Sequence, residues 1–326
     1  MAYVCVDYAD FSTMGPQFDT GDYDLSPTST LVQSPTDKDM PDIPADFPQS
    51  PIFHSAASLD ASPPDTVLIT TDSIAFYVHR CRLLSWSMND FGGLLIKQES
   101  FKSLGIASCV PQLLSAKDDA VLLSVILCVI YDLWATLPTF GLHDLAAGIR
   151  ALRHYGVDAR ALVAPQKPLM DVLLTHASLD PLEVFAIAAE NNLEPLAIRA
   201  SPYLLTFDFS SLADELARRI GCSYLLRLHL LCHSRMVFLR GLLLDQHEAH
   251  SPTSECSPKE QRIFEGAWAT TIASLAWEAD PDLSATRLKN ALEEAEAHAK
   301  CSDCKAGAKK RVKDIVRKWN ALQRTI

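Results

Sequence analysis

The strand-like segments of this 326-residue sequence lie between residues 67 and 114, and the part beyond Pro165 shows helical patterns almost throughout. The expected strands are Val67–Ile69, Ala75–His79 and Cys109–Leu114. The turn-forming residues Thr71–Ser73 separate the first two, which predicts an antiparallel hairpin. Strand and helix signals that are segregated along a chain are typical of an α+β fold. We therefore expect a small sheet capped by helices, followed by an all-α extension.

Helical spacing of apolar residues predicts the remaining elements. In the first half the expected helices are Arg82–Trp86, Asn89–Ile96, one that begins near Lys117 with Ser115 as its cap, and Leu142–Leu152. In the second half they are Leu169–His176, Leu182–Asn191, Leu196–Leu204, Leu212–Ile220 and Tyr224–Leu244, with two or three more before Gln323. The predicted domains are residues 64–165 and 166–247, and a loop over 248–258 precedes a C-terminal helical region, 259–326.

The first 63 residues have a different composition. Residues 1–64 hold nine of the 19 prolines and ten aspartates, with one lysine and no glutamate, so that this segment carries a net charge of −9. A segment of this kind buries too little apolar surface to offset the entropy of ordering. We expect a disordered acidic tail over 1–63.

Cysteine usage and missing motifs narrow the class of protein. Nine scattered cysteines and no signal peptide indicate reduced thiols in the cytoplasm, the nucleus or both. The longest apolar stretch contains Asp132, which argues against a membrane span. The common nucleotide-binding and hydrolase motifs are absent, and we predict that the chain is not an enzyme.

The hairpin region resembles a known domain. Asp65–Ile69, Phe76–Arg80 and Leu83–Ser85 follow the strand hairpin and F-x-V-H-[KR]-x-x-L pattern that opens a BTB/POZ domain. Asp180–Ala188 and the C-terminal Cys301-x-x-Cys304 with Arg317–Trp319 resemble the helical extension of the large BTB/POZ family of basidiomycete fungi. The resemblance covers residues 64–326.

The resemblance implies a non-catalytic protein-interaction module. It implies self-association as a homodimer and, in many relatives, adaptor function that presents a bound target to a cullin-type ubiquitin ligase. The alternative is a homo-oligomeric nuclear or cytosolic scaffold, associated with transcription, that does not bind a cullin. The resemblance to the BTB/POZ family also implies a structural role for His79, namely hydrogen bonding to the backbone. The residues expected to line the self-association surface, unless they are ordinary core, are Leu83, Leu84, Trp86 and Phe91.

Two pairs of residues suggest a structural zinc site. His229 and Cys232 are three apart on one helix face, and Cys301 and Cys304 form a CxxC turn. Thiolate and imidazole suit tetrahedral zinc, and short spacings let each pair chelate one ion. His233 or His298 is an alternative for His229, and the competing interpretations are ordinary thiols and a redox CxxC.

The C-terminal segment is basic. Residues 300–326 hold nine basic and two acidic groups, and Val312, Ile315, Val316, Trp319 and Leu322 fall on one helical stripe opposite them. We expect the stripe to pack on the body of the protein. The patch Lys310–Lys313 is a candidate for nuclear import, whereas nucleic-acid binding is not expected, since no helix-turn-helix or zinc-finger frame accompanies it.

Overall fold

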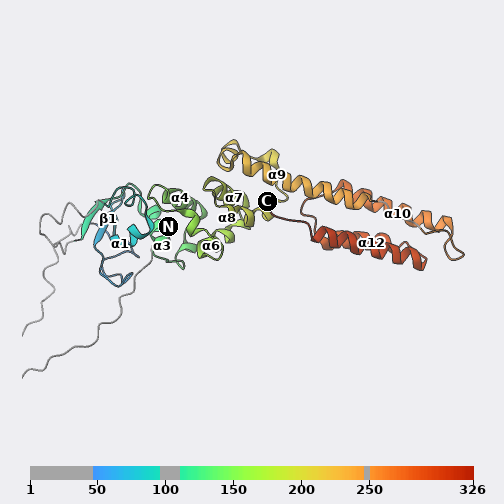
Figure 1. The fold of residues 1–326 in the computed structure, drawn as a ribbon, viewed down its shortest axis with the longest axis horizontal. Helices are drawn as coiled ribbons and strands as arrows, with labels where there is room; N and C mark the ends of the chain where they lie inside the picture. The colour runs from blue at the N-terminus through green and yellow to red at the C-terminus, as the bar shows by residue number, and fades with distance from the viewer. Residues whose placement is uncertain (1–46, 96–110, 246–249) are drawn as a thin grey trace, which may run out of the picture. The chain divides into compact units, whose positions relative to one another are not determined.

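The computed structural model describes residues 47–95, 111–245 and 250–326 and shows a mixed α+β protein (Figure 1). The strands are β1 (Thr66–Ile69), β2 (Ala75–Val78) and β3 (Gln112–Ser115). The helices of the first half are α1 (Arg80–Trp86), α3 (Ala120–Ile130), η1 (Leu137–Thr139), α4 (Leu142–Leu152) and α5 (Ala159–Leu162). Those that follow are α6 (Pro168–Ala177), α7 (Pro181–Glu190), α8 (Glu194–Ala200), η2 (Ser201–Leu204), η3 (Phe209–Ser211), α9 (Asp214–Leu244), α10 (Pro258–Trp277), α11 (Ala285–Glu296) and α12 (Ser302–Asn320).

The three strands form one sheet in the order β2-β1-β3. The predicted hairpin is confirmed, since β1 pairs antiparallel with β2 and Val67 lies opposite Tyr77. The Thr70 hydroxyl donates to the carbonyl of Ile74 and accepts from its N–H, which closes the turn. β3 pairs parallel with β1 and begins at Gln112, within the predicted third strand.

The folded unit begins before residue 64, which corrects the predicted length of the tail. The N–H of Ser50 donates to the carbonyl of Ala75, and the N–H of Tyr77 donates to that of Phe53. The Phe53 side chain is completely buried against Phe76 and Tyr131. Residues 47–63 therefore pack on the sheet, and residues 1–46 of the predicted tail lie outside the described part of the chain.

Two local predictions in the first half are wrong. Residues 89–95 form turns instead of a helix, because Asp90, Phe91, Gly92 and Gly93 all have positive φ. The helix expected to begin near Lys117 begins at Ala120, and its cap is Asp119, whose carboxylate accepts from the N–H of Leu122. Ser115 belongs to β3 instead.

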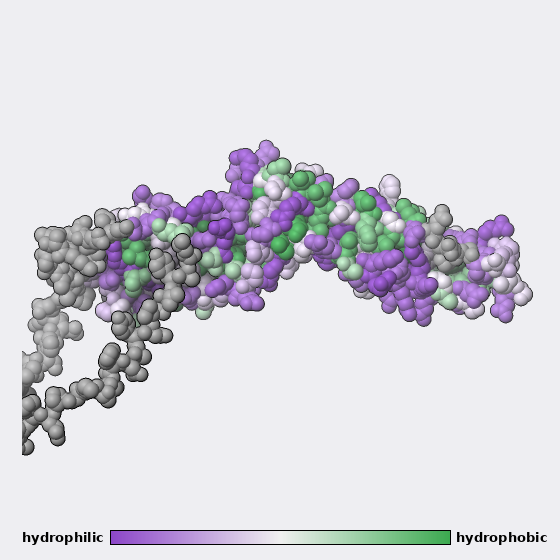
Figure 2. Space-filling model, viewed as in Figure 1, coloured by the Kyte–Doolittle hydropathy of each residue, from purple (hydrophilic) through white to green (hydrophobic). Residues whose placement is uncertain are grey.

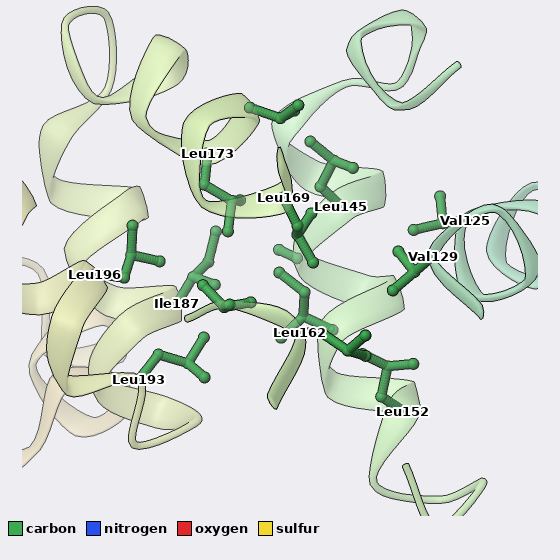
Figure 3. Close-up of a cluster of buried hydrophobic side chains, with 14 of the residues drawn as sticks. Val125, Val129, Leu145, Leu152, Leu162, Leu169, Leu173, Ile187, Leu193 and Leu196 are labelled. Carbon is green, nitrogen blue, oxygen red and sulfur yellow. The ribbon is translucent and has the colours of Figure 1, made fainter. Parts of the chain in front are cut away.

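Two hydrophobic cores lie along the described part of the chain. The first extends from Phe53 to Cys232 and brings together helices α3 to α9, and Figure 3 shows leucines and valines from α3 to α8 converging in it. The second extends from Leu239 to Trp319 and is built from α9 to α12. α9 contributes to both, so it is the element that they share.

α9 joins two helices that the sequence suggested were separate. Gly221, with φ of 76° and ψ of 158°, breaks the helical geometry between them, so α9 consists of two helical segments that meet at a kink, as the sequence predicts. A positive φ suits glycine because it has no Cβ. Arg219, two residues before this kink, pairs with Glu183 and Glu190 on α7. Further along, the apolar side chains of Leu226, Leu230 and Val237 stay exposed, and green residues reach the visible surface over α9 in Figure 2.

The predicted C-terminal helices are confirmed as α10, α11 and α12. Val312, Ile315 and Trp319 of the expected apolar stripe are buried, and Val316 and Leu322 pack beside them, while Lys309, Lys310 and Lys313 are exposed. Among the described residues, none of the helices has both the length and the apolar character that crossing a membrane requires.

Candidate metal centre

One histidine and three cysteines from two distant segments meet beside the second core. The Nε2 atom of His250 lies 3.2 Å from the Sγ atoms of both Cys301 and Cys304. The Sγ atom of Cys256 lies 3.9 Å from that of Cys304. All four atoms lie within 4.8 Å of one another. The arrangement is a compact set of one nitrogen and three sulfur donors.

The start of α12 holds the CxxC pair. Cys301 is the N-cap residue of this helix, and its Sγ accepts a hydrogen bond of 3.2 Å from the N–H of Cys304. Cys304 lies in the first helical turn, and helical side chains point toward the N-terminus of the helix, so its side chain lies near that of Cys301. Local helix capping alone therefore brings two sulfur atoms together.

The loop before α10 supplies the other two donors. The backbones of Thr253 and Cys256 exchange hydrogen bonds, which folds the loop into a turn. Ser257 then begins α10 with a capping box, in which its side chain and that of Glu260 each bond to the backbone of the other. Cys256 is thus fixed directly before a well-capped helix.

The orientation of the His250 ring is also fixed. Its Nδ1 atom lies 2.7 Å from the carbonyl oxygen of Ser251, which can only accept, so Nδ1 carries the proton. The Nε2 lone pair then faces the sulfur atoms. The side chain of Gln261 donates to the carbonyl of His250 at 2.9 Å and supports this loop from α10. Such outer contacts are typical of histidines that bind metals.

The donor set fits a tetrahedral ion. Zinc held about 2.3 Å from sulfur and about 2.0 Å from nitrogen separates two sulfurs by about 3.8 Å and a sulfur from a nitrogen by about 3.5 Å. The observed separations of 3.9 and 3.2 Å are close to these values. The three cysteines are buried and His250 is half-buried, as in closed structural sites.

The thiols differ in acidity. The N–H of Cys304, which donates to Cys301, lowers the pKa of the Cys301 thiol to about 6. Burial raises the pKa of Cys256 and, together with the neighbouring sulfur atoms, raises that of Cys304 to about 12. The hydrogen bond to Ser251 raises the pKa of His250. An ion bound here would displace protons from the groups that stay protonated at neutral pH.

The sequence identified two of these four residues. Cys301 and Cys304 belong to the cluster, but the other predicted pair does not, which corrects that part of the zinc prediction. Cys232 is buried, with its Sγ atom near the carbonyl of Leu204. His229 stacks on His233, and neither belongs to the cluster. His298 does not belong to it either.

His250 and Cys256 lie in the segment for which the sequence pattern predicts only a loop. A signal was present, since the Ser- and Pro-rich stretch before α10 contains a histidine and a cysteine six positions apart. Pairing that stretch with the CxxC required knowing that α10 and α11 bring residues 250–256 next to the start of α12.

The predicted self-association residues occupy two environments. Leu83 and Phe91 are completely buried in the first core, and Phe91 packs on Tyr155. Leu84 and Trp86 are half-buried and pack against that core. Only the latter two present surface that another molecule can contact.

His79 has the structural contacts that the resemblance implied. Its Nε2 atom lies 2.8 Å from the carbonyl of Ser62, and its Nδ1 atom lies 3.0 Å from the hydroxyl of Tyr131. That hydroxyl also accepts the N–H of His79 at 2.7 Å. The histidine joins the segment before β1 to the end of α3.

No protein-family model matches the chain, and neither a curated protein nor a solved structure does.

Proposed function

We propose that His250, Cys256, Cys301 and Cys304 hold a structural zinc ion. The observation that carries this proposal is the convergence of the four donor atoms within 4.8 Å, from two segments 45 residues apart at their nearest ligands, Cys256 and Cys301. Four protein ligands complete a tetrahedral shell and leave no position for a substrate. The ion therefore supplies cohesion, by joining the loop before α10 to the start of α12.

Metal analysis of the purified full chain tests this proposal. We expect one zinc per chain and loss of that zinc when Cys256 or Cys304 is replaced by serine. Cys81→Ser and Cys222→Ser are matched controls, because both thiols are exposed and outside the cluster. Purified wild-type protein without stoichiometric zinc, which also takes up none from a zinc-containing buffer, contradicts the proposal.

We propose further that the chain is a non-catalytic protein-interaction protein, with a BTB/POZ-like region followed by a metal-stabilised helical region. Three features support it: the β1–β2 hairpin, the contacts of His79, and the long succession of helices after α5. In this proposal the BTB/POZ-like region self-associates through the α1 segment, where Leu84 and Trp86 remain accessible, and serves as an adaptor for a cullin-type ubiquitin ligase.

Binding of the full chain to the purified N-terminal region of a fungal cullin tests the adaptor proposal. We expect a dissociation constant in the nanomolar to micromolar range. Oligomers that do not bind any of the cullins tested would favour the alternative, a homo-oligomeric scaffold in the cytoplasm or nucleus.

A further inference from the structure

The outer face of α10 is unusually apolar. Phe264, Trp268, Ile272 and Leu275 point into the second core, whereas a second row of residues faces solvent. That row is spaced alternately by three and four residues and consists of Ile263, Gly266, Thr270, Ala273 and Trp277. The Trp277 side chain is 89% exposed, and Ile263 is 52% exposed.

Charged residues are missing from the middle of this helix. From Gly266 to Trp277 it contains none, and charges occur only near its two ends. A helix with one face in a core normally carries charged or polar residues on the opposite face. The outer face of α10 has instead the composition of a packed surface.

We propose that this face binds the same face of a second copy of the chain, with the two helices antiparallel and a two-fold axis near Thr270. Ile263 and Trp277 each lie seven residues from Thr270, so the pairing places Ile263 of one copy against Trp277 of the other. The small residues between them allow the two backbones to approach closely. A two-fold interface requires a surface that is complementary to itself. This face meets that condition, because its large end residues, Ile263 and Trp277, lie opposite each other and its small central residues lie opposite small residues.

The charges at the helix ends are also complementary. Arg262 and Glu278 each lie eight residues from Thr270, so that each faces its opposite across the axis. The Arg262 guanidinium donates to the carbonyl of Pro258 and forms no ion pair among the described residues, whereas Glu278 also pairs with Arg287 of its own chain at 2.9 Å. A parallel pairing would set Arg262 against Arg262, and like charges disfavour it.

A shallow hollow on the same face can receive an apolar side chain. Arg240 of α9 and Ala273, Ala276 and Trp277 of α10 line it. Arg240 is held over α10 by a hydrogen bond of 3.2 Å to the carbonyl of Ala276. In the antiparallel pairing, Ile263 of the second copy lies over this hollow.

A single folded chain has room for a side chain at position 266 on the outer face of α10. A Cβ atom built on Gly266 meets nothing within 4 Å. Gly266→Leu therefore leaves the chain folded, and it favours the helix because glycine is a poor helix former. Between two copies the same side chain blocks the close approach of the backbones.

Sedimentation velocity of the full chain over a concentration series tests the proposal. We expect reversible association through the α10 face, in addition to any association through the α1 segment, and its dissociation constant should rise at least tenfold in Gly266→Leu and in Trp277→Glu. Leu179→Glu is the matched control, because Leu179 is 85% exposed but lies between α6 and α7, and it should leave the dissociation constant unchanged. Circular dichroism should show the same helix content in all three variants.

Reversed charges test the antiparallel geometry. Arg262→Glu and Glu278→Arg should each weaken the dimer, and the double variant should restore it. A wild-type chain that remains monomeric at 100-fold the concentration used for its purification would overturn the proposal, and so would oligomers whose size distribution is unchanged in Gly266→Leu and Trp277→Glu. A dimer formed only through the α1 segment gives the second result, so the two interfaces are distinguishable.

Discussion

The guanidinium of Arg235 lies over the indole ring of Trp319, 4.3 Å from its centroid, and joins the middle of α9 to the end of α12. The arginine is almost completely buried, and burial lowers its pKa. It donates to three carbonyl oxygens, those of Pro281, Leu322 and Gln323. Two of these carbonyls directly follow the C-terminal end of α12, where a cation is favourable, and Arg235 lies between Cys232 of the first core and Leu239 of the second along α9.

Replacement of Arg235 by methionine should destabilise the protein by about 3 kcal/mol, since it leaves buried carbonyl oxygens without donors. Arg235→Lys should recover only part of that loss, because an ammonium lacks the planar fork that bonds to several carbonyls at once. Urea denaturation followed by tryptophan fluorescence measures both changes. An Arg235→Met variant as stable as the wild type would show that these hydrogen bonds contribute nothing net.

Removal of the metal should loosen the loop before α10 and the start of α12 more than the sheet. We expect chelator to lower the melting temperature of the wild type and to leave that of Cys256→Ser unchanged. Hydrogen exchange should show faster exchange in residues 250–257 and 301–305, with the amides of β1 unaffected. Equal loss of protection in both regions would contradict a local role.

The start of the folded unit can be tested by truncation. A chain that begins at residue 47 should be as stable as the full chain. One that begins at residue 64 lacks Phe53, and loss of a buried phenylalanine side chain costs about 3–5 kcal/mol. Phe53→Ala in the full chain should reproduce most of that loss in thermal denaturation, unless the contacts of residues 47–63 are dispensable.

Gly148→Ala should destabilise the contact between α3 and α4 by about 1–3 kcal/mol, as expected for an overpacked site. A Cβ atom at position 148 would lie 2.4 Å from the Cγ1 atom of Val125. Val125→Ala in the same chain should recover part of the lost stability. Denaturant melts of the single and double variants measure the coupling, and purely additive effects would rule out the steric explanation.

Glu194 gives a pH-dependent contribution to stability. The hydrogen bond from Arg227 lowers the pKa of this carboxyl from its ordinary value of 4.5. A lowered carboxyl pKa stabilises the fold above pH 4.5, and the contribution disappears as pH falls through the folded-state pKa. Glu194→Gln should therefore be less stable than the wild type at pH 7, with a smaller difference at pH 3. A constant difference would point to lost packing instead.

The sequence predicted the elements whose signals are local. The alternation of the β1–β2 hairpin and the apolar spacing of α4, α6, α7 and α12 gave the correct structures. At Asp90–Gly93 the hydrophobic spacing predicts a helix, but four consecutive residues with positive φ form turns there. The Ser87 hydroxyl accepts from the N–H of Phe91 and donates to the carbonyl of Tyr155, and no local pattern reveals that second, long-range contact.

At the metal centre, too, local sequence signals predict only part of the structure. The CxxC pair is a local signal and was found, whereas its partners were assigned by helical spacing to His229 and Cys232. The actual partners, His250 and Cys256, are determined by α10 and α11, which bring the start of α12 next to the loop before α10. Similarly, Leu83 and Phe91 belong to the predicted interface, but Leu83 is buried in the first core and Phe91 packs on Tyr155, 64 residues further along the chain.

The contact between Arg235 and Trp319 also bears on how the protein is completed during synthesis. Arg235 leaves the ribosome 84 residues before Trp319, and Cys256 leaves 45 residues before Cys301. Until α12 has emerged, a nascent chain exposes a guanidinium on an otherwise apolar helix face together with a thiol and an imidazole that lack their partners. A polypeptide that stops short of α12 therefore leaves the Arg235 guanidinium without the Trp319 ring and the Leu322 and Gln323 carbonyls that it contacts in the complete fold.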